Sequence, residues 1–156
     1  MRRSRMGSAG AGHQSLALVR YPPYHEVLLG NARQLITAGH FQAAVLIAHM
    51  ACEVCTGQVI VGLMERRGLE EAQEWAEEYR ESFSFLNPTV RALYFSLTGE
   101  RINIAFRRWR EHAGSVELRN RLSHRGARVT EAQAENACDV VQALTARLRR
   151  ALDRAK

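Results

Sequence analysis

The feature that most constrains the fold is a long apolar stretch in the first half of the chain. Residues 41–67 read FQAAVLIAHMACEVCTGQVIVGLMERR, with apolar side chains on all sides of a helix of this length. Such a helix is buried in a protein core or in a membrane. Residues 43–64 are about long enough to span a bilayer, but they include Glu53, and a central carboxylate costs about 2.5–3.5 kcal/mol there. We therefore expect a central core helix and no membrane association.

The other patterns are helical as well, and no run alternates apolar and polar residues as a strand does. Gly39, Gly68, Gly99 and Gly126 mark helix ends, and Thr130 with Gln133 fits a capping box. The sequence predicts an all-α bundle of about five to six helices with short, antiparallel connections. The expected helices cover residues 24–38, 41–67, 70–81, 88–98, 101–124 (with an interruption at Gly114-Ser115) and 131–154.

Length and cysteine content predict one domain in a reducing compartment. We expect a disordered basic arm over residues 1–20 and one helical domain over residues 21–156, since 156 residues suffice for one core. The basic start lacks the apolar segment of a secretory signal. The three cysteines lie in apolar helical patterns rather than in loops, which favours the cytoplasm over an oxidising compartment.

Positive charge is concentrated in one part of the chain. The formal net charge is +6, and residues 101–128 hold eight arginines against two glutamates, whereas residues 70–81 hold six glutamates and one arginine. A basic surface suits a polyanionic partner, although net charge alone indicates only solubility and non-specific attraction.

The stretch ELRNRLSHRG, residues 117–126, gathers polar side chains at the end of an expected helix. Asn120 and His124 are four residues apart and share a helix face. Arg119 precedes them, and Gly126 suits the position after the last turn. Arginine binds phosphate oxygens through several donors, and histidine exchanges protons near neutral pH. The stretch is either a phosphate-handling site or a solvated helix end, where cations are stabilising in any case.

Glu53 raises a related question, because a carboxylate in a buried helix needs a partner. His49 lies one turn before it. Two interpretations stay open: an arginine of residues 117–126 pairs with Glu53, or Glu53 is half-solvated at a subunit interface or cavity edge.

These residues resemble the HEPN superfamily, the higher eukaryotes and prokaryotes nucleotide-binding domain. RNRLSH matches the R-x4–6-H motif of that family, with an asparagine after the arginine. AVLIAHMACEV resembles its core helix with an acidic residue, and the order of helix pair, variable middle, motif and closing helix is similar over about residues 21–150.

The resemblance implies a dimeric helical bundle that is a metal-independent endoribonuclease of toxin–antitoxin or phage-defence type. Arg119 would bind the scissile phosphate, His124 would act as general base or acid, Asn120 would orient the substrate or the motif, and Glu53 would direct Arg119. The implied partners are RNA, a second copy and an antitoxin or nucleotidyltransferase-type protein, with no metal or other cofactor. The alternative is a non-catalytic HEPN-like module that binds nucleic acid, a nucleotide or a protein.

Two other groups of residues have competing interpretations. His49, Cys52 and Cys55 have a metal-site spacing, but one helix spreads them over about 120°, so we expect core packing. Trp109 either stacks on a base or lies on the apolar face of its helix, and the second is expected. The candidates for contact with the RNA backbone are Arg107, Arg108, Arg110, Arg121 and Arg125.

Overall fold

The computed structural model describes residues 22–79 and 81–155, so the expected basic arm over residues 1–20 lies outside the described residues. These described residues contain seven helices and no strand, which confirms the all-α prediction. The helices are α1 (Tyr24–Thr37), α2 (Phe41–Arg66), α3 (Ala72–Glu78), α4 (Pro88–Thr98), α5 (Ile102–Ala105), α6 (Trp109–Arg125) and α7 (Glu131–Arg154).

Helix α2 is the centre of the fold, as its apolar composition predicts. It packs between α1 and α7, with α3, α4 and α6 against its remaining sides. Most of its buried side chains are small or branched, among them Ala48, Cys55, Val59 and Ile60. It is the one helix of the described part that is long and apolar enough to cross a membrane, and most of its apolar stretch is covered by other helices.

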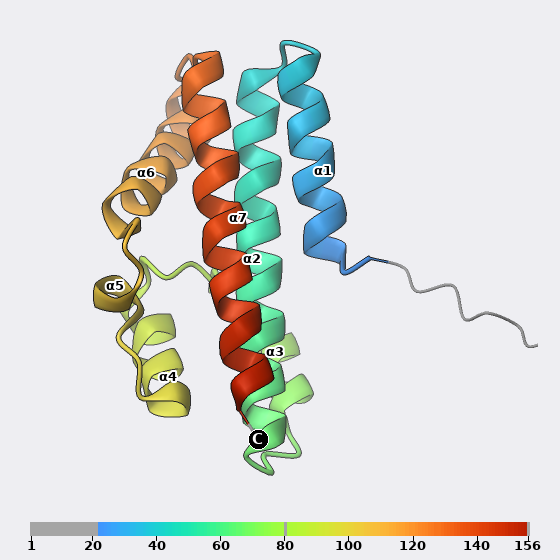
Figure 1. Ribbon diagram of the computed structural model, residues 1–156, viewed down its shortest axis with the longest axis vertical. Coiled ribbons are helices and arrows are strands. Elements are labelled where there is room, and N and C mark those ends of the chain that lie inside the picture. Colours follow the sequence, from blue (N-terminus) through green and yellow to red (C-terminus); the bar gives the residue numbers. More distant parts are fainter. Residues whose placement is uncertain (1–21, 80, 156) are drawn as a thin grey trace, which may run out of the picture.

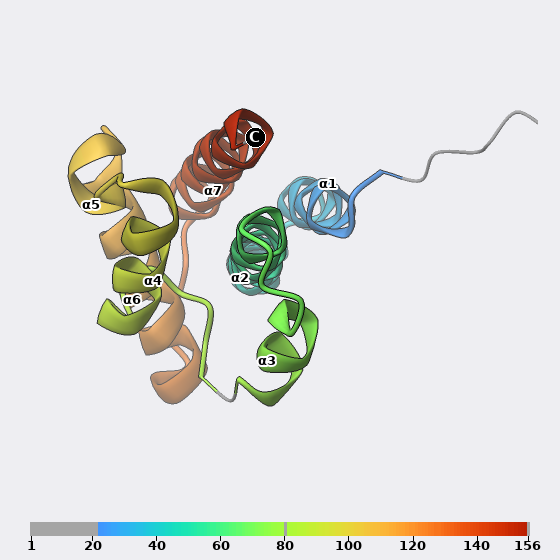
Figure 2. The same ribbon diagram turned by 90° about the horizontal axis from the view of Figure 1, so that it is seen from below.

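Helices α1, α2 and α7 form the body of the bundle (Figure 1). The chain runs up α1 and down α2, so this connected pair is antiparallel as predicted, but α7 runs in the same direction as α2. The segment from α3 to α6 carries the chain back before α7 begins. Figure 2 shows α1, α2 and α7 nearly end on, whereas α6 lies obliquely across this direction.

Seven helices are more than the expected five to six, because the chain breaks between Ala105 and Trp109 rather than at Gly114-Ser115. Phe106 is extended and buried, with Ile102 buried one turn earlier, so packing of these two side chains overrides helix continuation. Gly114 is tolerated inside α6, where glycine costs about 1 kcal/mol relative to alanine. The acidic helix expected over residues 70–81 is shorter and covers Ala72–Glu78.

The ends of α6 and α7 have the predicted chemistry. Gly126 follows α6 with φ of 60°, a left-handed conformation that glycine adopts without steric cost. The Thr130 side chain accepts a hydrogen bond from the Gln133 backbone, and the Gln133 side chain accepts one from the Thr130 backbone. This capping box fixes where α7 begins, and therefore how the end of α6 connects to the core.

Candidate functional site

An ion pair between Glu53 and Arg119 joins the middle of α2 to α6. Only 29% of the Glu53 side chain and 27% of the Arg119 side chain are exposed. Glu53 therefore has the arginine partner of the first interpretation, and it also keeps some contact with solvent. Partial burial strengthens the attraction relative to an exposed ion pair, because less water screens the charges.

Arg119 also contacts its neighbour in the motif. Its Nη1 donates to the side-chain oxygen of Asn120 at 3.1 Å, while Nη2 donates to Glu53. A guanidinium has five N–H donors, so these two contacts leave donors for an anion. The two acceptors orient the Arg119 side chain between the α2 surface and the exposed face of α6.

His124 lies in the last turn of α6 and is exposed, as is Asn120. The two are one helical turn apart on the same face. Arg119 is thus linked directly to Asn120, and Asn120 shares a surface with His124. Asn120 and His124 therefore share an exposed face of α6, next to Arg119, whose side chain is anchored to α2.

A buried polar cluster lies beside this ion pair, and the sequence did not predict it. Nε2 of His49 and Oγ of Ser115 are joined by a hydrogen bond of 2.8 Å. The His112 ring centroid is 6.3 Å from that of His49, and Trp109 packs on His112 at 5.6 Å. Trp109 is partly buried against the core, as its apolar-face interpretation predicted.

Burial strongly disfavours the charged form of both histidines. Burial, the nearby His112 and the positive charge of Arg119 lower the pKa of His49 from 6.5 to about 3. Burial lowers the pKa of His112 to about 4. Both rings are therefore neutral at physiological pH. One sequence signal was available: His49 precedes Glu53 by four residues, as Ser115 precedes Arg119.

The arginines expected to contact the RNA backbone are spread from the start of α6 to its end. Arg107 and Arg108 line a pocket between the start of α6 and the α7 residues Arg147 and Arg150, which the sequence did not single out. The other candidates, Arg110, Arg121 and Arg125, are exposed along α6. At 1.5 Å per residue, α6 separates its two ends by about 24 Å.

The spacing of His49, Cys52 and Cys55 does not produce a metal site. Within the described residues no three histidine, cysteine or acidic side chains gather closely enough to hold an ion. Both cysteines are buried thiols, and burial raises the pKa of each to about 12. His49 is turned to Ser115 instead, so these side chains serve packing.

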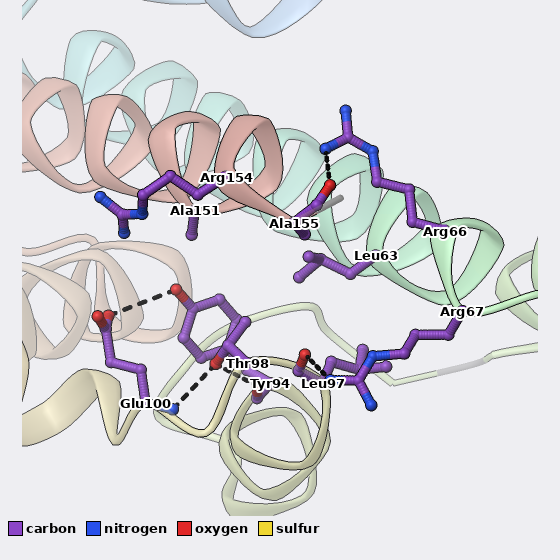
Figure 3. A pocket seen from close by; sticks show the side chains of 10 residues that line it. All are labelled: Leu63, Arg66, Arg67, Tyr94, Leu97, Thr98, Glu100, Ala151, Arg154 and Ala155. Atoms are coloured by element: carbon purple, nitrogen blue, oxygen red, sulfur yellow. Dashed lines mark hydrogen bonds between the residues drawn. The ribbon is translucent and has the colours of Figure 1, made fainter.

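Another cavity lies where α2, α4 and α7 end (Figure 3). Arg66 donates to the backbone oxygens of Leu152 and Ala155, and Arg67 donates to the oxygen of Leu97 at 2.9 Å. The Leu97 carbonyl lies in the last turn of α4, and the Leu152 and Ala155 carbonyls lie at the end of α7, where helix carbonyls need partners from outside the helix. The two arginines therefore hold helix ends together.

Comparison with known proteins identifies no family. No family model, no curated protein and no solved structure matches the chain.

Proposed function

We propose that this protein is an endoribonuclease that cleaves RNA through the 2′-hydroxyl, with Arg119, Asn120 and His124 at its site. The observation that carries the proposal is the Glu53–Arg119 ion pair, because it holds the arginine of the motif in a fixed direction beside Asn120. It also agrees with the resemblance of RNRLSH and its acidic core helix to the HEPN superfamily.

The proposed reaction needs only groups of the motif and solvent water. His124 accepts the proton of the 2′-hydroxyl as that oxygen attacks the adjacent phosphorus. The bond from phosphorus to the 5′-oxygen breaks, and that oxygen takes a proton from water to leave as a 5′-hydroxyl. Arg119 stabilises the negative charge on the phosphate oxygens. The products carry a 2′,3′-cyclic phosphate and a 5′-hydroxyl, and no metal takes part.

A second copy of the chain is part of the proposal. Leu46 and Met50 are 39% and 48% exposed on α2, four residues apart, and Glu53 follows one turn later. Exposed apolar side chains next to a polar site are typical of an interface. Pairing of two copies through this part of α2 would bring two motifs together and exclude water from the phosphate.

The test is cleavage of a labelled mixed-sequence RNA in EDTA. We expect wild-type protein to cut the RNA and His124→Ala to cut it about 10²–10⁴-fold more slowly, which is the usual contribution of a general acid or base. His40→Ala, at another exposed histidine, is the matched control and should cut normally. Products ending in a 3′-hydroxyl and a 5′-phosphate would refute the mechanism, because the 2′-oxygen would not be the nucleophile.

A second outcome would favour the alternative function. If neither wild type nor His124→Ala cuts, but both bind RNA equally with a steep loss of affinity in salt, the protein is a binding module. The absence of RNA binding even at low salt would refute both RNA-directed functions and favour a solvated helix end.

A further inference from the structure

The hydrogen bond between His49 and Ser115 lies one turn from the Glu53–Arg119 ion pair on both helices. His49 precedes Glu53 by four residues on α2, and Ser115 precedes Arg119 by four residues on α6. His49 is 3% exposed and Ser115 is 4% exposed. The two contacts therefore form consecutive steps along the α2–α6 interface, one buried and one at its edge.

Two such contacts control the geometry more strictly than one. Helix α6 crosses α2 obliquely (Figure 2), so the two helices meet over a short length. A single ion pair through the long arginine side chain would let α6 pivot about that point. A second contact about 6 Å away along the helix, at 1.5 Å per residue, removes this freedom.

The chemistry of the second contact suits this role. Serine is short, so its hydroxyl reports the position of the α6 backbone, and the 2.8 Å bond to the His49 ring leaves little slack. His112 and Trp109 pack beside it from α6 and limit movement of the ring. The Arg119 side chain, by contrast, has many rotamers, so its ion pair alone does not hold α6 in one orientation.

We propose that His49 and Ser115 are positioning residues that fix the rotation of α6 on α2 and thereby the direction of Arg119. This positioning role depends only on the contacts between α2 and α6. Its consequence for RNA cleavage rests on the proposed function.

The first test measures Arg119 directly, without RNA. An arginine-selective dicarbonyl reagent is applied to wild type, Ser115→Ala and His49→Leu, and modification of each arginine is followed by peptide mass spectrometry. Arg121, exposed on the same helix, is the internal reference. We expect both variants to modify Arg119 several-fold faster relative to Arg121. His49→Gln, whose amide can still bond Ser115, should restore most of the wild-type protection.

Either removal variant can decide the question if the other does not fold. Circular dichroism and cooperative urea unfolding identify the folded variants. Wild-type protection of Arg119 in a folded variant that lacks the hydrogen bond would overturn the proposal. Equal acceleration at Arg121 would also overturn it, because that result means general loosening of α6.

The second test separates this inference from the proposed function. In the RNA assay, Ser115→Ala is expected to lower kcat about 10–100-fold, as small misplacements of a catalytic group do, and to leave KM nearly unchanged. The kcat of His49→Gln should be closer to the wild-type value than the kcat of His49→Leu. If wild-type protein cleaves no RNA, the proposed function fails, whereas the reactivity of Arg119 still decides the positioning role.

Discussion

Replacing His112 by leucine is expected to stabilise the protein and to reduce its sensitivity to acid. His112 is 1% exposed, and neither ring nitrogen has a hydrogen-bond partner among the described residues. An unpaired buried polar group costs about 1–3 kcal/mol. Leucine has a similar volume and no polar atom, so we expect the free energy of unfolding at pH 7 to rise by about 1 kcal/mol.

The pH dependence provides the larger effect. The pKa of His112 falls from 6.5 to about 4 on folding because the ring is buried. The unfolded chain thus binds a proton more readily, and the stability present above pH 6.5 is lost as the pH falls toward 4. At about 1.4 kcal/mol per pH unit, this one histidine should remove about 2 kcal/mol between pH 7 and pH 5. His49, also buried, contributes with the same sign.

The assay is urea unfolding at pH 7, 6 and 5, followed by circular dichroism. We expect His112→Leu to lose about 2 kcal/mol less than wild type over this range. His40→Gln, at an exposed position, should behave as wild type. An identical pH dependence in wild type and His112→Leu would refute the reasoning, because it would mean that His112 is not buried as a neutral ring.

Three further predictions concern the ion pair, the basic pocket and a helix cap. Glu53→Leu should lower the free energy of unfolding by about 2 kcal/mol, because a partly buried arginine loses its partner, and Glu53→Gln should lower it by less. Equal urea midpoints for wild type and Glu53→Leu would contradict this. The double variant Arg107→Gln/Arg150→Gln should reduce the slope of log affinity for single-stranded RNA against log salt by about 1.4, measured by anisotropy; an unchanged slope would exclude this pocket. Thr130→Ala should cost about 1 kcal/mol, with recovery in Thr130→Ser; no loss in urea unfolding would mean that the cap is dispensable.

Local signals in the sequence predicted much of the helical framework. The apolar side chains on all sides of residues 41–67 identified the central helix. Gly126 located the end of α6, and Thr130 located the start of α7. These features depend on neighbouring residues and on backbone conformation alone. The contact of Glu53 with an arginine of the motif was one of two open interpretations, and the structure shows this contact with Arg119.

The misses depend on tertiary packing. The break before α6 follows from burial of Phe106, and no local stop signal marks it. The bond between His49 and Ser115 joins residues 66 positions apart, so neither side chain reveals it by itself. The oblique crossing of α6 on α2 brings these residues together, and crossing angles are set by surfaces that the linear pattern does not display.

The parallel arrangement of α2 and α7 has a consequence for biosynthesis. About 60 residues separate the end of α2 from the start of α7, so α2 leaves the ribosome that many residues before α7 does. During that interval the side of α2 that α7 covers in the finished bundle has no helix over it. At about 5–20 residues per second, the nascent chain exposes this surface for several seconds, which makes α2 a natural substrate for chaperones that bind apolar segments.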